Sequence, residues 1–108
     1  DPGYVVNPAQ VERQIAGSFV YGLSALFYGG CTVKDGRIEQ TNFDSYQMLR
    51  IDQAPAIEVH IVPSTEPPGG MGETGTSGIV PAISNAIFAA TGKRLRKMPV
   101  DPAVLKQA

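Results

Sequence analysis

The sequence predicts an α+β fold with two layers, in which helices pack on a mixed sheet. Two stretches of helical character, 7–28 and 76–92, alternate with short extended stretches that suit strands. Charges are nearly absent from both helical stretches, which is typical of helices that are covered on most sides. A length of 108 residues is enough for a real core, so we expect a single piece, 1–108, with no internal boundary.

The first helix is expected from Asn7 to about Tyr28. Asn7 is a good N-cap, Pro8 suits the first helical position, and Gln10 can complete a capping box. The helix should end at Gly29-Gly30, because glycine adopts a left-handed C-cap at little cost.

This first helix is apolar around most of its circumference beyond its first turns. We therefore expect it to be buried, with the stretch 57–62 among its packing partners. Gly17 and Gly22 each cost about 1 kcal/mol relative to alanine in a helix, so they predict close packing of another backbone or a cofactor, with helix-on-sheet packing as the favoured interpretation. The uncharged run is shorter than the roughly 20 residues that cross a bilayer, so no membrane span is expected.

The extended elements are predicted by turn signals and alternation. A short strand is expected at 3–6, and a β-hairpin at 31–40, because Asp35-Gly36 is a turn signal between extended residues. The stretch 41–50 is mixed and polar and is expected to be irregular. The clearest strand is 57–62, which alternates apolar and polar residues.

The second helix is expected to be capped by Thr76 or Ser77 and to end at Gly92. Pro81 is compatible with this helix only if it falls in the first turn. The free N–H groups of its N-terminus would favour anionic ligand atoms near the preceding loop. Asp101-Pro102 predicts a last short helix at 103–108.

Composition excludes several classes of site. Nine basic and ten acidic residues leave the chain nearly neutral, so no nucleic acid partner is expected. The only cysteine, Cys31, excludes an internal disulfide and a cysteine metal cluster, and is expected to be a small packed side chain. The only histidine, His60, excludes a multi-histidine metal site and is interpreted as a side chain on a strand face. The basic run 93–97 is interpreted as a solvated edge strand or a subunit contact.

The stretch 63–78 is rich in glycine and proline and carries Glu73 among its glycines, just before the second helix. A carboxylate held on such a loop is either a positioned acid or base or a solvated loop residue. Gly70 to Gly75 also matches the dinucleotide fingerprint G-x-G-x-x-G. A dinucleotide site is not expected, because seven residues separate the motif from the strand, and basic residues stand where an acid is required.

Four pieces of the sequence occur in a characteristic order: Asp1-x-Gly3-x-x-Val6-Asn7-Pro8, Gln14-Ile-Ala-Gly17, Gly22-Leu23 and Gly70-Met-Gly-Glu-Thr-Gly75. Together they resemble the C-terminal end of the large subunit of molybdenum hydroxylases, the xanthine oxidase family. Further details are most similar to the isoquinoline oxidoreductase β subunit: Asn42-Phe-Asp-x-Tyr46, Met48-Leu-Arg50, Ala54-Pro55 and Gly69 to Gly75. The resemblance covers essentially the whole chain.

The resemblance implies a catalytic base at Glu73 and a cofactor contact at Gln14, with Gly72 in the cofactor-binding loop. The cofactor would be a molybdenum–molybdopterin centre, usually in its cytosine dinucleotide form in bacterial members. Its metal would be held by the pterin rather than by protein side chains. The sequence departs from the family in two places. Thr74-Gly75 stands where xanthine oxidases have two prolines, and Ala16 stands where many members have Glu, so xanthine specificity is not carried over.

For the parent protein, the resemblance implies hydroxylation of an N-heteroaromatic ring carbon with oxygen from water. A small iron–sulfur subunit would remove the electrons, because this chain lacks the cluster cysteines. The second candidate is an aldehyde-oxidising enzyme of the same family. An alternative from a different class is a non-catalytic module that binds an anion or a partner. The parent is expected to be bacterial, and either cytoplasmic or periplasmic. The 108 residues alone are expected to be inactive and to lack the cofactor.

Overall fold

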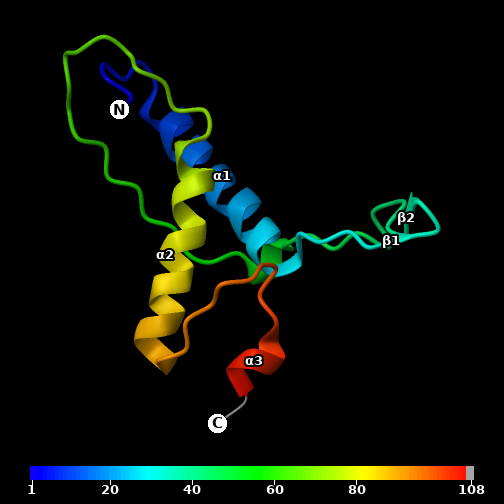
Figure 1. The fold of residues 1–108 in the computed structure, drawn as a ribbon. Helices are drawn as coiled ribbons and strands as arrows, with labels where there is room; N and C mark the ends of the chain where they lie inside the picture. The colour runs from blue at the N-terminus through cyan, green and yellow to red at the C-terminus, as the bar shows by residue number, and fades with distance from the viewer. Residues whose placement is uncertain (107–108) are drawn as a thin grey trace.

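A computed structural model describes residues 1–106. Two long helices lie side by side, a small hairpin projects away from them, and a short helix lies below (Figure 1). No helix in the described part of the chain is long and apolar enough to cross a bilayer. In chain order the elements are α1 (Pro8–Tyr28), β1 (Val33–Lys34), β2 (Arg37–Ile38), the 3₁₀ helix η1 (Ile51–Gln53), α2 (Thr74–Thr91) and α3 (Pro102–Lys106).

The chain combines helices with a sheet, as expected, but the sheet is a two-stranded antiparallel hairpin rather than a mixed sheet. The two long helices pack on each other and not on a sheet. The expected strands 3–6 and 57–62 are not paired to any strand within residues 1–106. A strand is defined by its neighbour, and alternation in the sequence predicts its side-chain period without supplying that neighbour.

Helix α1 begins as predicted: the Asn7 side chain accepts a hydrogen bond from the backbone N–H of Gln10 at 3.4 Å. It ends at Tyr28, also as predicted. The predicted left-handed C-cap was wrong, because Gly29 has φ −68° and Gly30 is not among the glycines with positive φ. The prediction that α1 is buried on most sides was also wrong for this chain. One face of α1 packs on α2, whereas Tyr21 on another face is 70% exposed.

Helix α2 begins at Thr74, with Glu73 as its N-cap, rather than at the predicted caps Thr76 or Ser77. Pro81 therefore lies inside the helix and not in its first turn, contrary to the prediction. The earlier start has a packing cause, since Gly75 is buried against α1 and brings the first turn into the helix–helix contact. The C-terminus agrees with the prediction: Gly92 is left-handed with φ 70°, and its N–H bonds to the Phe88 carbonyl.

The core lies at the lower end of α1, where Leu23, Leu26 and Val100 are buried. The Val100 N–H donates to the Leu26 carbonyl at 2.8 Å, which fastens the C-terminal segment to α1. Partly buried aliphatic side chains from α2, α3 and the connecting segments surround this cluster: Leu49, Ile79, Val80, Ile83, Leu95 and Leu105.

The basic run 93–97 is not the predicted edge strand. The Lys93 ammonium donates to the carbonyls of Val104 and Leu105 near the end of α3. Arg94 stacks over the ring of Phe88 at 3.8 Å from the centroid. Lys93 therefore connects the segment after α2 to α3, whereas Arg94 folds back onto α2. The start of α3 is capped as predicted, with the Asp101 carboxylate accepting from the Ala103 N–H at 2.8 Å, while 107–108 fall outside the described residues.

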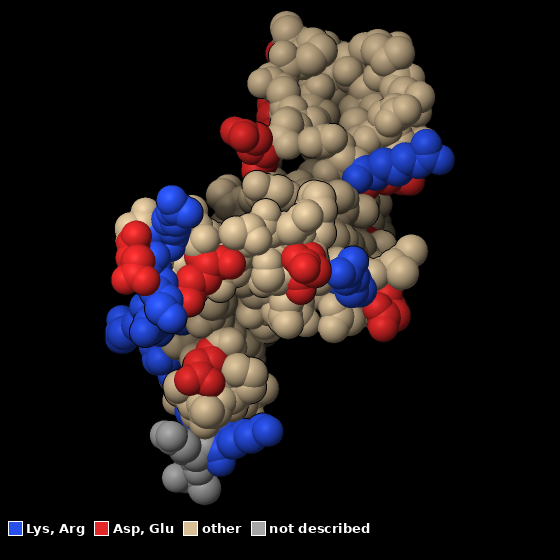
Figure 2. All heavy atoms as spheres, turned by 90° about the vertical axis from the view of Figure 1, so that its right-hand side faces the viewer, with Lys and Arg blue, Asp and Glu red and all other residues tan. Residues whose placement is uncertain are grey.

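The predicted hairpin is present, with positive φ at Asp35 (50°) and Gly36 (74°) and with Val33 opposite Ile38. It extends away from the helices (Figure 1), which leaves Cys31 exposed rather than packed as predicted. Figure 2 shows charges of both signs interspersed on this side of the molecule, whereas the upper end of the molecule is mostly uncharged. That uncharged end contains the start of α1 and the glycine-rich loop (Figure 1).

Candidate functional site

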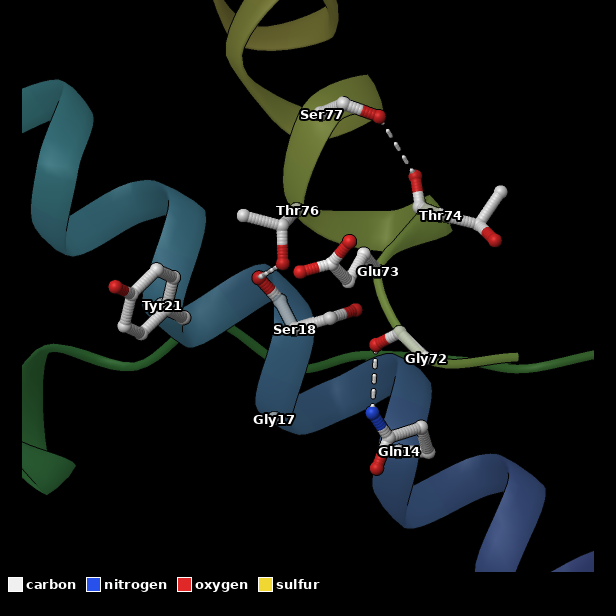
Figure 3. Close-up of a pocket in the computed structure, with 9 residues that line it drawn as sticks. All are labelled: Gln14, Gly17, Ser18, Tyr21, Gly72, Glu73, Thr74, Thr76 and Ser77. Atoms are coloured by element: carbon white, nitrogen blue, oxygen red, sulfur yellow. Dashed lines mark hydrogen bonds between the residues drawn. The ribbon is translucent and has the colours of Figure 1, made fainter. Parts of the chain in front are cut away.

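An open cavity of about 710 Å³ lies where the glycine-rich loop meets the two long helices (Figure 3). One wall is a face of α1 and the other is the loop end with the first turn of α2. Its lining residues are Gln14, Gly17, Ser18, Tyr21, Gly72, Glu73, Thr74, Thr76 and Ser77. The structure therefore brings together all three predicted site residues, although 58 positions separate Gln14 from Gly72.

A hydrogen bond ties the loop to α1 beside Glu73. The Gln14 side-chain nitrogen donates to the Gly72 carbonyl at 2.7 Å (Figure 3). Because Gly72 directly precedes Glu73, this bond restrains the peptide from which the carboxylate projects. It uses one of the two N–H groups of the Gln14 amide and leaves its carbonyl oxygen available.

Two glycines allow α2 to approach α1 closely at this point. A Cβ on Gly75 would overlap the Ser18 hydroxyl and lie 3.1 Å from the Phe19 ring. A Cβ on Gly22 would lie 2.8 Å from the Thr76 carbonyl. This close packing, together with the bond from Gln14, fixes the first turn of α2 relative to α1. Gly22 thus confirms the predicted approach of another backbone, whereas Gly17 faces open space and lines the cavity.

Among residues 1–106, Glu73 is the only one with a carboxylate side chain that lines the cavity. It is the N-cap residue of α2, yet its side chain accepts no capping hydrogen bond. Two of the neighbouring hydroxyls bond to backbone carbonyls: Ser77 donates to the Thr74 carbonyl at 3.3 Å, and Thr76 donates to the Ser18 carbonyl at 3.4 Å. The Glu73 carboxylate is exposed to the cavity and is free to accept a proton from a bound molecule.

The polar groups that line the cavity suit a polar or anionic ligand. No group of three His, Cys, Asp or Glu side chains within residues 1–106 could hold a metal ion. The cavity instead offers the amide of Gln14, the peptide at Gly72 and the N-terminus of α2. Backbone N–H groups of a helix N-terminus favour anionic or strongly polar ligand atoms. These groups suit a pterin with an attached phosphate.

Sequence reasoning missed Ser18 and Tyr21 of the α1 wall, whereas Gly17 was predicted to lie against another backbone or a cofactor. Gly17, Ser18 and Tyr21 follow Gln14 at intervals of three, four and seven positions, which places them on one face of a helix. That periodicity was visible in the sequence once Gln14 had been identified. The hydroxyl residues of α2 were harder to find, because the true start of the helix was not predicted.

Comparison with known proteins gives one family. The molybdopterin cofactor-binding domain family matches residues 1–55. The chain is 43% identical, over 95% of its length, to a protein of Gluconacetobacter polyoxogenes named membrane-bound aldehyde dehydrogenase (pyrroloquinoline-quinone). It is 38% identical, over 96% of its length, to the isoquinoline 1-oxidoreductase subunit beta of Brevundimonas diminuta.

The fold occurs in a crystal structure of a Cu,Mo-CO dehydrogenase, with a TM-score of 0.80 over 97% of this chain and 23% sequence identity. The chain spans 13% of each of the two relatives and 14% of that dehydrogenase chain. The family match covers half of the chain, and relatives named as molybdenum-binding or isoquinoline oxidoreductase subunits extend the similarity across the remainder. The chain therefore belongs to the molybdopterin cofactor-binding domain family of molybdenum hydroxylase large subunits.

Proposed function

We propose that residues 1–108 form one piece of the cofactor-binding domain of a molybdenum hydroxylase, with Glu73 as its general base. The observation that carries this proposal is the position of the Glu73 carboxylate and its lack of a capping hydrogen bond. It lies at a helix N-terminus without capping that helix, and it lines the cavity next to the Gln14–Gly72 hydrogen bond. A carboxylate that is fixed at its backbone and free at its oxygens is suited to accept a proton.

In the proposed reaction, a ring C–H of an N-heteroaromatic substrate becomes C–OH, with the oxygen supplied by water. Two electrons and two protons leave the substrate and the water. The molybdenum–molybdopterin group supplies the redox chemistry when it is bound. Glu73 accepts a proton at its carboxylate as the water oxygen is transferred, and the uncharged walls of the cavity contain no other carboxylate to compete for it.

Gln14 and Gly72 are the proposed cofactor contacts. Both residues line the cavity, Gln14 from α1 and Gly72 from the loop, and the amide oxygen of Gln14 makes no hydrogen bond within residues 1–106. We propose the cytosine dinucleotide form of the cofactor on the basis of the family resemblance. A small iron–sulfur subunit is the proposed electron acceptor, in keeping with relatives that are themselves named as subunits.

Aldehyde oxidation is the second candidate, because the relative with 43% identity is named as an aldehyde dehydrogenase. The name of that protein also specifies pyrroloquinoline quinone, so cofactor content distinguishes the possibilities. Molybdenum in stoichiometric amount, measured by mass spectrometry of the purified parent protein, supports the proposal. Turnover of isoquinoline-type rings compared with aldehydes then separates the two activities.

The base is tested by Glu73→Gln in the full-length parent enzyme, with Glu66→Gln as the matched control. Both acids lie in the same loop region and are exposed, but only Glu73 lines the cavity. General base catalysis contributes about 10²–10⁴-fold, so Glu73→Gln should lower kcat by at least about 100-fold. Glu66→Gln should leave kcat near wild type, and the molybdenum and pterin content of both variants should be unchanged.

Retention of most of kcat by a fully loaded Glu73→Gln enzyme would refute the assignment of the base. Equal losses in Glu73→Gln and Glu66→Gln would also refute it, because the effect would then belong to the charge of the loop. Loss of activity together with the cofactor would instead identify a structural role for the loop that carries Glu73.

A further inference from the structure

The segment 1–4 packs directly against the first half of the glycine-rich loop. The Tyr4 N–H donates to the Glu66 carbonyl at 2.8 Å, and Gly3 is buried. The Gly3 N–H in turn donates to the Asp1 carboxylate at 2.9 Å, which closes a tight turn. Figure 1 shows this dark blue segment beside the yellow-green loop. Two stretches that are far apart in the sequence are therefore fastened to each other here.

Position 3 requires glycine. Its φ is 58°, in the left-handed region that side chains disfavour. A Cβ on Gly3 would overlap the Pro67 carbonyl oxygen and would lie 2.6 Å from the Glu66 carbonyl oxygen. Both oxygens belong to the backbone, so no side chain can rotate away to make room. The loop approaches equally closely from its own side, because a Cβ on Gly69 would lie 2.9 Å from the Asp1 carbonyl oxygen.

Within residues 1–106, two hydrogen bonds from other segments reach the glycine-rich loop ahead of α2. One is the bond from Tyr4 to Glu66, and the other is the bond from Gln14 to Gly72. Between these two points Gly70 has φ 117°, and a Cβ on Gly70 or Gly72 would meet nothing within 4 Å. Glycines in open space give a chain little stiffness, so the two ends of this span set its path.

We infer that Gly3 is a positioning residue for the candidate base. By packing against the backbone of 66–67, it fixes the first end of the loop and with it the path of the chain into Glu73. This inference rests on the proposed function of Glu73 as general base. Gly3 does not line the candidate cavity, so its effect on turnover passes through the loop.

The test is Gly3→Ala in the full-length parent enzyme, with Gly36→Ala as the matched control. Gly36 also has a positive φ, 74°, but a Cβ there meets nothing within 4 Å, and the hairpin that contains it extends away from the helices. Gly3→Ala should speed amide hydrogen exchange of a peptide that covers 64–72 about tenfold or more relative to Gly36→Ala. Equal exchange of this peptide in the two variants would overturn the inference.

Kinetics separate positioning from general damage. Gly3→Ala should lower kcat about tenfold or more with KM within about twofold of wild type, because a misplacement of about 1 Å costs up to about 100-fold. In the Glu73→Gln background the same substitution should change kcat less than about twofold, since the group that it positions is absent.

Loss of kcat by the same factor in both backgrounds would overturn the positioning role. A large loss in Glu73→Gln with unchanged kcat in Gly3→Ala would overturn this inference alone. A Glu73→Gln enzyme that retains most of its kcat would instead overturn the proposed base, and the positioning role with it.

Gly69→Ala is a second variant, on the other side of the same contact. Its backbone φ is not positive, so the substitution adds only the overlap with the Asp1 carbonyl. It should speed exchange of the 64–72 peptide about threefold or more relative to Gly36→Ala, which is a strict control because it carries a φ penalty as well. Exchange no faster than in Gly36→Ala would contradict the packing of 1–4 on the loop, even where Gly3→Ala does not accumulate as folded protein.

Discussion

Gly22→Ala tests whether close helix packing holds the proposed site together. A Cβ at Gly22 would meet the Ile79 side chain and would lie 2.8 Å from the backbone carbonyl of Thr76. A side chain can rotate away, but a carbonyl in the first turns of α2 moves only if the helix moves. Gly22→Ala should therefore push apart α1 and the start of α2.

Gly17→Ala is the matched control for this change. Both glycines lie in α1, so each alanine gains about 1 kcal/mol of helix propensity. A Cβ at Gly17 meets nothing within 4 Å, so the difference between the variants isolates the steric term. Overpacking costs about 1–3 kcal/mol, which corresponds to about 5-fold to 150-fold in a local opening equilibrium.

The assay is amide hydrogen exchange of the first turns of α2, since exchange reports local opening rather than global unfolding. Gly22→Ala should accelerate exchange about 5-fold to 150-fold relative to Gly17→Ala, and should lower kcat because Glu73 is carried by the same turn. Equal exchange in the two variants would refute the claim that the α1–α2 approach at Gly22 positions the site.

Two further substitutions test the core and the loop. Leu23→Ala should destabilise α1 by about 2–5 kcal/mol, because the Leu23 side chain is only 3% exposed. The control Ile51→Ala should cost under about 0.5 kcal/mol, because the Ile51 side chain is 96% exposed. Similar amide exchange rates of α1 in the two variants would contradict the assigned core. Gln14→Leu removes the hydrogen bond to the Gly72 carbonyl and should speed amide hydrogen exchange in the glycine-rich loop about twofold to tenfold. The control Gln10→Leu should leave this exchange rate unchanged, because the Gln10 side chain makes no hydrogen bond within residues 1–106. Unchanged exchange in Gln14→Leu would show that the loop is held by other contacts.

Sequence reasoning succeeded where a feature depends on a few adjacent residues. The cap at Asn7, the hairpin turn at Asp35-Gly36 and the helix stop at Gly92 each require only local backbone geometry. The expectations that failed depend on distant partners. The strand 57–62 lacks its neighbour within residues 1–106, and the start of α2 is set by packing of Gly75 on α1.

The predicted site residues also differ in whether a local sequence pattern or a distant contact identifies them. Glu73 stood out because one acid lies among glycines before a helix, which is a local pattern. Nothing in the spacing of the sequence pairs Gln14 with Gly72, and only the family resemblance placed both near one cofactor. The structure adds the direct bond between them. Their roles toward a cofactor stay predictions, which the substitutions above address.

The packing of α2 explains how the backbone at Glu73 can be held while its carboxylate makes no bond to the helix. An N-cap side chain that bonds its own helix contributes about 1 kcal/mol, but its oxygens are then directed at backbone N–H groups. Glu73 makes no such bond, and α2 also contains Pro81, which removes a backbone donor. The helix therefore depends on packing through Gly75 and Gly22 for its position. Stability that comes from the helix–helix contact leaves the carboxylate uncommitted, and this is the condition that a general base in the cavity requires.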